Sequence, residues 1–316
     1  MKIDVLGVNI DNLKKIEVIN KISGLIDHPS LLKTGKPVFI VTPYSEFIVA
    51  AQKDPEFRNI LNSADIALPD GVGILWAAKY LSLPLKFSIF NFQFSKYLLA
   101  CWRLVYSLSA VILNPQYIRS PIPEKISGSE FIWDLAGLSA KNNYSIFLLG
   151  GHGETPELVA QKLKVKYPNL KIAGVGNPVI ASPNPKSGRG NPIAEEMASS
   201  PLDVLETPRN DRLATTQDLI QKINSSSADF LFVALGPITQ EKWIYRNLPN
   251  LRVKLAIGLG GTFDYLAGKR PLAPNFLRFT GLEWLWRLVT QPWRVLRITK
   301  GVIGLIYFCY KSKIIN

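Results

Sequence analysis

The sequence predicts an α/β fold with a mainly parallel, Rossmann-like sheet that helices cover on both faces. Short apolar runs rich in β-branched residues recur along the chain. Each run ends in a loop that contains Gly or Pro, and a helical pattern of apolar residues follows each loop. Strands that alternate with helices in this way build parallel sheets. Because ligands bind to such sheets beyond the carboxyl ends of the strands, we expect the functional residues in the loops that follow the strands.

Five strand–loop–helix units make up this pattern. In chain order they are PVFIVTPYSEFIVAAQ (37–52), DIALPDGVGILWAAKYL (65–81), YSIFLLGGHGETPELVAQKLKVKYP (144–168), DFLFVALGPITQEKWIYRNL (229–248) and VKLAIGLGGTFDYLAG (253–268). In the third unit, Thr155 is a favourable N-cap residue and Pro156 a favourable first helical residue, so we expect the helix to begin there.

Two segments interrupt the pattern. Residues 176–217 are rich in Pro, Ser, Gly and Asn, which predicts a long surface loop, and loops of this length also act as lids. Residues 94–115 predict a helix in which Arg103 and Ser107 share one narrow polar stripe and apolar side chains cover the other sides. The longest stretch of this helix without a charged residue is too short to span a bilayer. It is either a buried core helix or one that lies in a membrane interface or an oligomer contact.

The C-terminal segment has a composition of its own, which predicts a core over residues 1–270 and a helical, basic appendage over 271–316. The appendage holds seven Lys or Arg residues and one acid, Glu283, and three of its tryptophans interleave with arginines. Trp and Arg at this density fit the headgroup region of a membrane or phosphates near it. The alternative is a basic helix that docks on its own domain. We expect truncation after Lys269 to reduce activity far more than folding.

The charge and the rare residue types exclude several classes of protein. A formal net charge of +13 indicates an anionic partner. The cations lie among tryptophans rather than along a polar groove, which argues against nucleic acid. Two cysteines and two histidines are too few for a disulfide framework or a histidine-rich metal site, so we expect no cofactor and no metal. The N-terminus lacks the pattern of a signal peptide, so we expect a cytoplasmic protein.

The loops that follow the later strands are rich in glycine, which suits them to bind phosphate through backbone N–H groups. None of them is a Walker A loop or a complete dinucleotide fingerprint, and the chain contains no Asp-x-Asp. These loops favour a nucleotide-containing substrate without ATP hydrolysis and without a metal clamp. The charge of the leaving group would then be met by backbone amides, a helix N-terminus, or Arg and Lys. The candidate glycines are Gly150, Gly151, Gly236, Gly260 and Gly261.

Asp70 stands between the end of a predicted strand and the start of a predicted helix, in the segment LPDGVG. Aspartate is favoured as an N-cap, so the residue types alone favour a helix cap. The same position at the carboxyl end of a strand also suits a general base that faces a substrate.

Several motifs of the chain resemble, in the same order, those of the bacterial WecG/TagA/CpsF glycosyltransferases (glycosyltransferase family 26). They are TPYSE, LPDGVGILWAAKYL, PEKISGSEFIWDL, FLLGG, FVALGPITQEKWI, GLGGTFDYLAGK and GLEWLWRL, and the resemblance runs from about residue 3 to residue 297. It implies inverting, metal-independent transfer of an N-acetylmannosamine-type sugar. The implied donor is a UDP-sugar, and the implied acceptor is polyprenyl-diphosphate-linked N-acetylglucosamine. The product would serve teichoic acid or other cell-surface polysaccharides, and the enzyme would sit peripherally on the inner face of the cell membrane.

The resemblance assigns roles to individual residues. Asp70 would be the catalytic base, and Thr42 would hold or polarise a substrate group. Gly71 belongs to the same motif as Asp70, and Gln240 would touch the donor or acceptor sugar. Three arginines of the appendage, Arg287, Arg294 and Arg297, would meet the diphosphate. Glu241 and Asp264 are acids in suitable loops, but helix capping or packing explains each of them at least as well.

The chain departs from the family pattern in three places. Tyr44 stands where many members have Asn, so the recognition of sugar or uracil is expected to differ. Residues 86–121 look inserted and residues 176–217 look expanded. The insertion is expected to add a membrane contact or an assembly surface, so an anionic membrane surface and a second copy of the chain are both candidate partners.

Two other functions remain open at this point. The first is a catalytically silent, membrane-associated scaffold of the same fold, which Tyr44 favours and which the intact Thr42, Asp70 and Gln240 argue against. The second is a nicotinamide-dependent oxidoreductase. This class needs a complete Gly-x-Gly-x-x-Gly after the first strand of the sheet, and TPYSE stands there instead.

Overall fold

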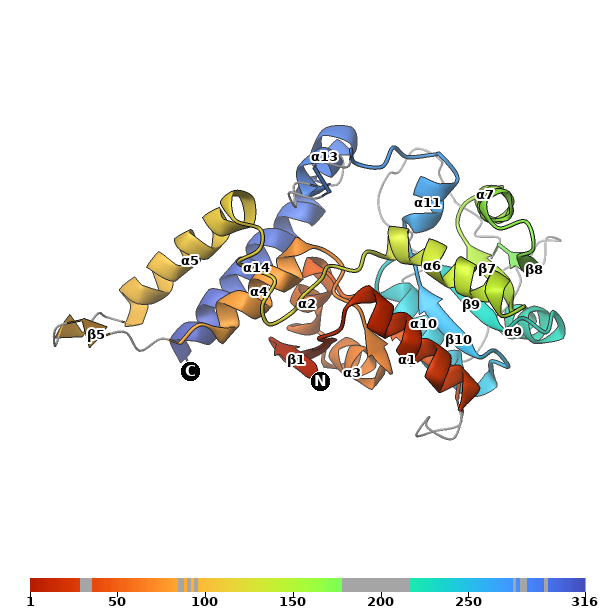
Figure 1. The fold of residues 1–316 in the computed structure, drawn as a ribbon, viewed down its shortest axis with the longest axis horizontal. Coiled ribbons are helices and arrows are strands. Elements are labelled where there is room, and N and C mark those ends of the chain that lie inside the picture. The colour runs from red at the N-terminus through yellow and green to blue at the C-terminus, as the bar shows by residue number, and fades with distance from the viewer. Residues whose placement is uncertain are drawn as a thin grey trace, which may run out of the picture. The chain divides into compact units, whose positions relative to one another are not determined.

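The computed structural model of the chain describes residues 1–28, 36–84, 88–89, 92–93, 96–177, 216–274, 277–278, 283–292 and 295–315 (Figure 1). Most of the segment expected to be a long loop, and Arg294 of the appendage, lie outside the described residues.

The described strands and helices alternate as expected over the five units. The strands are β1 (Lys2–Val5), β2 (Val8–Asp11), β3 (Val38–Val41), β4 (Ile66–Ala67), β5 (Ser88–Ile89), β6 (Phe92–Gln93), β7 (Ser145–Gly150), β8 (Lys171–Gly176), β9 (Phe230–Ala234) and β10 (Leu255–Gly258). The helices are α1 (Lys15–Asp27), α2 (Ser45–Ala51), α3 (Pro55–Ser63), α4 (Val72–Ser82), α5 (Lys96–Leu113), α6 (Gly128–Lys141), α7 (Thr155–Lys166), α9 (Thr216–Ser225), α10 (Thr239–Asn247), the 3₁₀ turn η2 (Leu248–Asn250), α11 (Thr262–Leu266), α13 (Glu283–Thr290) and α14 (Val295–Ile315).

The main sheet has six strands in the order β4-β3-β10-β9-β7-β8. The pairs of β10 with β3, β10 with β9, β7 with β9 and β7 with β8 are all parallel. Helices flank this sheet, and the fold is therefore Rossmann-like, which confirms the predicted fold class. β1 and β2 form a separate antiparallel hairpin.

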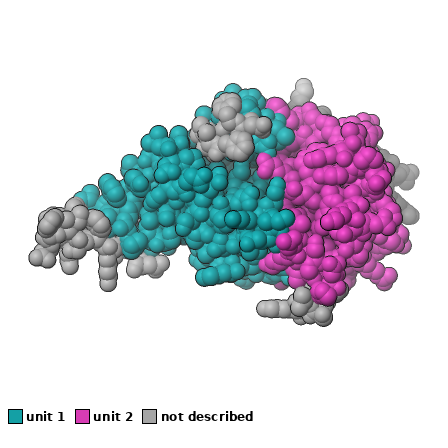
Figure 2. Space-filling model, viewed as in Figure 1, with its two compact units in different colours: residues 1–18, 42–127, 272–316 teal, residues 19–41, 128–271 magenta. Residues whose placement is uncertain are grey.

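The chain divides into two compact units, drawn in teal and magenta in Figure 2. Unit 1 comprises residues 1–18, 42–127 and 272–316, and unit 2 comprises residues 19–41 and 128–271. One boundary between the two units falls between residues 271 and 272. The appendage is part of unit 1, together with the segment that contains Asp70.

Unit 2 contains most of the parallel sheet. All residues of β3 and β10 are buried, as expected for strands covered on both faces, and this burial explains their continuous apolar sequences. α10 packs against β3, β9 and β10, whereas α6 and α7 pack against β7. The rigid sheet thereby holds the loops after β7, β9 and β10 at one edge, because parallel strands end on the same side.

Unit 1 is built around α14, which packs against α2, α4 and α5 (blue, beside the orange and yellow helices of Figure 1). Leu305 and Cys309 of α14 are buried in this unit, and Gly304 allows close approach because a Cβ there would lie 3.0 Å from a methyl carbon of Val49. The appendage thus contributes core residues. Because truncation after Lys269 would remove these buried residues, we now expect it to impair folding as well as activity.

The N-cap of α7 corrects one expectation. Thr155 is the first residue of α7 and Glu154 is the N-cap. The Thr155 hydroxyl donates to the carbonyl of His152 at 2.6 Å and accepts from Nζ of Lys269 at 2.6 Å. The predicted N-cap is therefore wrong by one residue. The Thr155 hydroxyl bonds to the carbonyl of His152 in the glycine loop and to Lys269, and it does not cap the helix.

α5 is not a buried core helix, so that interpretation of residues 94–115 is wrong. Seven of its large hydrophobic side chains are exposed, among them Trp102 and Val105, whereas Ser107 of the polar stripe is fully buried. None of the helices in the described residues combines the length and the hydropathy that a membrane-spanning segment requires.

Candidate active site

Backbone hydrogen bonds join three of the sequence motifs within unit 1. Thr42 directly follows β3 and is buried. The N–H of Asp70 donates to the carbonyl of Pro43 at 2.9 Å, and the N–H of Ile126 donates to the carbonyl of Pro69 at 3.0 Å. The TPYSE, PDG and PEKIS motifs therefore meet at the loop that carries Asp70, and this loop has a defined position relative to that of Thr42.

Asp70 is not the N-cap of α4. The N-cap is Gly71, whose φ of 103° lies in a region that favours glycine, and the helix begins at Val72. The interpretation of Asp70 as the capping residue is therefore wrong, because the chain turns one residue later. Asp70 is partly buried and keeps some exposed surface, so solvent or a substrate can reach it.

Arg297 of the appendage reaches the TPYSE motif. Its Nε donates to Oε2 of Glu46 at 2.6 Å, and its Nη2 donates to the hydroxyl of Tyr44 at 2.9 Å. Tyr44 in turn donates to Oε2 of Glu46 at 3.2 Å. Burial lowers the pKa of Arg297, but Tyr44 and Glu46 outweigh burial and raise it. Tyr44 therefore helps to hold Arg297 in place, a role that the sequence alone did not suggest.

Arg287 is held within its own helix. Its Nη2 donates to Oε1 of Glu283 at 2.7 Å, one turn earlier, and Lys125 lies 3.5 Å from the other oxygen of Glu283. Burial raises the pKa of Glu283, but Arg287 and Lys125 outweigh burial and lower it. Arg287 thus shares its charge with a carboxylate, and the predicted contact of Arg287 with a diphosphate stays a prediction.

The glycine loops of unit 2 gather at the carboxyl edge of the sheet, and they serve different purposes there. The N–H of Gly151 donates to the carbonyl of Ala234 at 3.0 Å, and a Cβ on Gly150 would lie 2.5 Å from that oxygen. Gly150 thereby lets β7 and β9 approach each other, whereas a Cβ on Gly151 would lie 3.0 Å from the Cβ of Thr155 at the start of α7. A Cβ on Gly236 or Gly261 would meet nothing within 4 Å, so a ligand can approach the backbone closely at these two positions.

Gln240 and Glu241 form a buried pair that links the loops after β9 and β10. Nε2 of Gln240 donates to Oε1 of Glu241 at 2.7 Å, and Oε1 of Gln240 accepts from the N–H of Gly260 at 2.8 Å. The other oxygen of Glu241 accepts from the N–H of Ile238 at 2.8 Å and caps α10. The expected capping role of Glu241 is confirmed. The amide of Gln240 is used inside the protein, and its contact with a sugar stays a prediction.

The buried pair predicts a pH dependence of stability. Burial raises the pKa of Glu241 from 4.5 to about 7. The folded state therefore binds the proton more tightly than the unfolded state, and the free energy of unfolding falls as the pH rises between these two values. We expect a loss of about 3 kcal/mol over this range. Thermal melts of wild type and Glu241→Gln across the range should show that the variant lacks this part of the slope.

The matched control is Glu157→Gln, which makes the same change at an exposed position of α7. This control should keep the wild-type slope. A Glu241→Gln variant with the same slope as wild type would contradict a protonation equilibrium at Glu241.

The other acid considered from the sequence has a packing role. Asp264 forms an ion pair with Arg270 at 3.2 Å. Within the part of the chain that the structure describes, no three His, Cys, Asp or Glu side chains come together in a group that could hold a metal ion.

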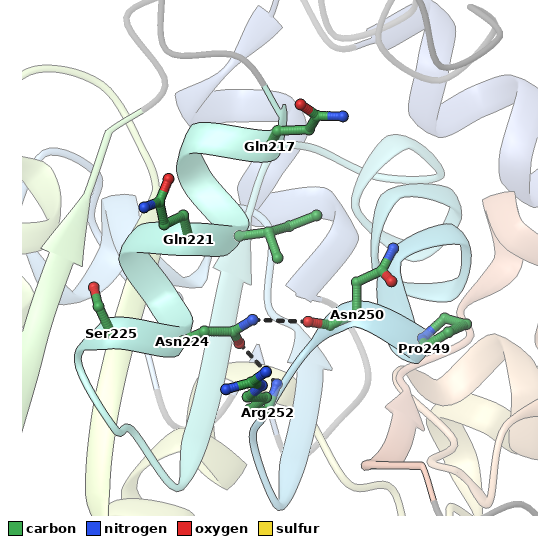
Figure 3. Close-up of a pocket in the computed structure, with 8 residues that line it drawn as sticks. Gln217, Gln221, Asn224, Ser225, Pro249, Asn250 and Arg252 are labelled. Carbon is green, nitrogen blue, oxygen red and sulfur yellow. Dashed lines mark hydrogen bonds between the residues drawn. The ribbon is translucent and has the colours of Figure 1, made fainter.

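A hollow of about 740 Å³ lies at the opposite edge of unit 2 (Figure 3). It is lined by residues along the whole length of α9 and by the η2 turn and the loop that follow α10 and precede β10. Asn224 joins these two elements, because it donates to the carbonyl of Asn250 at 2.8 Å and accepts from the N–H of Arg252 at 2.8 Å. These residues precede the amino ends of β9 and β10. The hollow contains no residue that the sequence analysis proposed for the site.

The fold and the residues at its strand ends define the class of protein: a Rossmann-like α/β protein whose strand-end loops carry glycines and, at Asp70, a partly exposed aspartate. The family model "Glycosyl transferase WecG/TagA/CpsF family" matches residues 3–103 and 104–316. The chain therefore belongs to the WecG/TagA/CpsF family of glycosyltransferases, which confirms the resemblance and argues against an oxidoreductase.

Several curated relatives share the name N-acetylglucosaminyldiphosphoundecaprenol N-acetyl-beta-D-mannosaminyltransferase. The protein of that name from Bacillus subtilis strain 168 is 25% identical over 262 residues, which cover 83% of this chain and 74% of the relative. The protein from Bacillus spizizenii W23 is 24% identical, over an alignment that covers 92% of this chain and 87% of the relative. The protein from Staphylococcus aureus MRSA252 is 21% identical, over an alignment that covers 99% of this chain and 93% of the relative.

Proposed function

We propose that this chain transfers an N-acetylmannosamine-type sugar from a UDP donor to a polyprenyl-diphosphate-linked N-acetylglucosamine, with inversion and without a metal. The names of the relatives support the sugar and the acceptor. The observation that carries the proposal is the position of Asp70: a partly buried aspartate in a loop that a backbone hydrogen bond joins to the Thr42 motif. The product would enter cell-surface polysaccharide or teichoic acid synthesis, and the enzyme would work at the inner face of the membrane.

The proposed reaction is a single displacement. Asp70 removes the proton from the acceptor hydroxyl as that oxygen bonds to the anomeric carbon of the donor sugar. The bond from that carbon to the diphosphate breaks on the opposite side, and UDP leaves with the electron pair. Thr42 holds or polarises a substrate group beside the base. The proton then passes from Asp70 to solvent, which returns the enzyme to its starting state.

The charge of the departing diphosphate has to be stabilised by the protein itself in this proposal. The chain contains no Asp-x-Asp that would hold a cation on a nucleotide-sugar. Backbone N–H groups at open glycines such as Gly236 and Gly261 are suited to the phosphates, as are the arginines of the appendage. Arg297 would exchange its partners Glu46 and Tyr44 for a phosphate, at a position already next to the Thr42 motif.

The proposal is tested by the release of UDP from UDP-N-acetylmannosamine by the full chain, with and without a short-chain lipid diphosphate N-acetylglucosamine and with and without EDTA. We expect release that requires the acceptor and that EDTA does not change. Loss of activity in EDTA, with recovery on addition of a divalent cation, would contradict the metal-free mechanism. Release from another UDP-sugar only would contradict the proposed donor, and no release from any UDP-sugar would favour the silent scaffold.

A further inference from the structure

The outward face of α5 is an apolar surface on a helix of unit 1. Along this face, aromatic and aliphatic side chains follow one another at helical spacing. The exposed fractions are 55% for Tyr97, 58% for Leu98, 61% for Trp102, 68% for Val105, 46% for Tyr106, 55% for Ile112 and 82% for Leu113. An amphipathic helix of a water-soluble surface would turn these residues inward. We call this set the α5 face.

The opposite side of α5 docks on the rest of unit 1 through small and polar residues. Ala100, Ser107 and Ala110 are buried there. Nε1 of Trp76 donates to the hydroxyl of Ser107 at 3.0 Å, and the hydroxyl of Tyr80 donates to the carbonyl of Ala100 at 3.2 Å. Because these directional bonds fix which side of the helix points inward, rotation of α5 cannot bury the α5 face.

The aromatic side chains of the α5 face are ordered by contacts with one another. Trp102 stacks on Tyr106 with ring centroids 5.5 Å apart, and Tyr106 meets Tyr117 edge to face at 5.2 Å. Nζ of Lys79 lies 4.8 Å from the centroid of the Tyr117 ring. Trp and Tyr beside lysine are the side chains that favour the boundary between lipid headgroups and acyl chains.

The charge around the α5 face has a single sign. Residues 86–123 and residues 284–316 contain no Asp or Glu, but they contain four and six Lys or Arg residues, respectively. Lys300 and Lys311 are exposed on α14, which packs beside α5 (Figure 1), and Arg119 is exposed just after α5. An apolar stripe with cations and without acids is complementary to an anionic lipid surface.

We propose that the α5 face inserts into the headgroup boundary of an anionic lipid bilayer. This inference rests on the proposed function, since a polyprenyl-linked acceptor is held in such a bilayer. A second copy of the chain fits the surface less well. In a twofold contact the same patch lies on both sides, so the cations around one α5 face would meet those of the other without any acids to pair with.

The first test is sedimentation of the full chain with vesicles, without sugar nucleotide or acceptor. Wild type should bind vesicles of equal parts phosphatidylglycerol and phosphatidylcholine and should bind phosphatidylcholine alone much more weakly. Val105→Glu removes an apolar side chain and adds a negative charge, so it should bind the anionic vesicles about tenfold more weakly. The matched control is Val165→Glu on α7, an equally simple change at a valine that is 83% exposed, and it should bind as wild type does.

The second test uses the native cysteines as probes. Cys101 is exposed on α5, whereas Cys309 is fully buried and burial raises its pKa to about 12. A charged, membrane-impermeant maleimide should therefore modify Cys101 alone. Anionic vesicles should slow this modification about tenfold if most of the protein is bound with α5 inserted, and phosphatidylcholine vesicles should not.

Two results would overturn the proposal. The first is Val105→Glu binding to anionic vesicles as tightly as wild type, with Cys101 still fully reactive in their presence. The second is a dimer in vesicle-free solution that Val105→Glu converts to a monomer while vesicle binding is unchanged, because the α5 face would then bind a second copy. Since neither assay contains a sugar nucleotide, failure of the lipid contact is distinguishable from failure of sugar transfer. Melting curves of each variant show that the fold is retained.

Discussion

Asp70→Asn should abolish most sugar transfer while the protein stays folded. The substitution keeps the size of the side chain and the backbone hydrogen bond to Pro43, which the N–H of residue 70 donates. It removes the carboxylate that would accept the proton of the attacking hydroxyl. Loss of a general base lowers the rate by about a hundredfold to ten-thousandfold, so kcat should fall in that range. The measurement is acceptor-dependent UDP release, with the binding of UDP to the variant followed in parallel.

Two further variants make the Asp70 result interpretable. Asp65→Asn makes the same change five residues earlier, at a residue that is also partly buried, and it should transfer sugar at close to the wild-type rate. Asn followed by Gly71 deamidates readily back to an acid, so Asp70→Ala should be measured beside it. If both Asp70 variants kept the wild-type kcat, Asp70 would not be the base, and the candidate site would need another acceptor for the proton.

Leu305→Ala should destabilise the protein strongly, although Leu305 lies in the segment expected to be an appendage. Its side chain is 2% exposed, and it contacts the core of unit 1 next to Gly73. Truncation of a buried leucine costs about 2–5 kcal/mol, depending on how far the surroundings relax. Urea or thermal unfolding should therefore show a much lower midpoint for the variant.

The control for Leu305→Ala is Ile303→Ala, two residues earlier on the same helix. Ile303 is 60% exposed, so its truncation should change the free energy of unfolding by only about 0.5 kcal/mol. Equal, small effects of both substitutions would mean that α14 does not belong to the folded core. In that case the truncation after Lys269 that the charge pattern suggests would again be a clean test of activity.

The contacts of Arg297 could not be predicted from the sequence. Its partner Glu46 lies 251 positions earlier in the chain, and the two residues meet only because α14 packs on α2. The same holds for Gln240, which looks in sequence like a sugar ligand. In the structure both ends of its amide are bound, to Glu241 and to the N–H of Gly260. Long-range partners of polar groups depend on which elements are brought together in space, and local spacing does not contain that information.

The exact residues at which helices begin also could not be predicted from the sequence. Thr155 and Asp70 are both residue types that favour an N-cap, but Glu154 and Gly71 occupy the N-cap positions. A shift of one residue changes which side chain faces the helix start. Capping preferences amount to about 1 kcal/mol, so they are overridden when tertiary contacts such as that of Lys269 with Thr155 compete for the same hydroxyl.

By itself, the sequence determined the α/β class, the order of strands and helices and the family, because periodic apolar runs and strand-end loops are local features of the chain. Only the tertiary structure decided that the basic C-terminal segment supplies core residues to unit 1, and that α5 turns its aromatic side outward and its serine inward. The physical reason is the same in both cases. A helix with apolar residues on most sides has no preferred inward face until specific contacts, here Ser107 with Trp76 and Leu305 beside Gly73, select one.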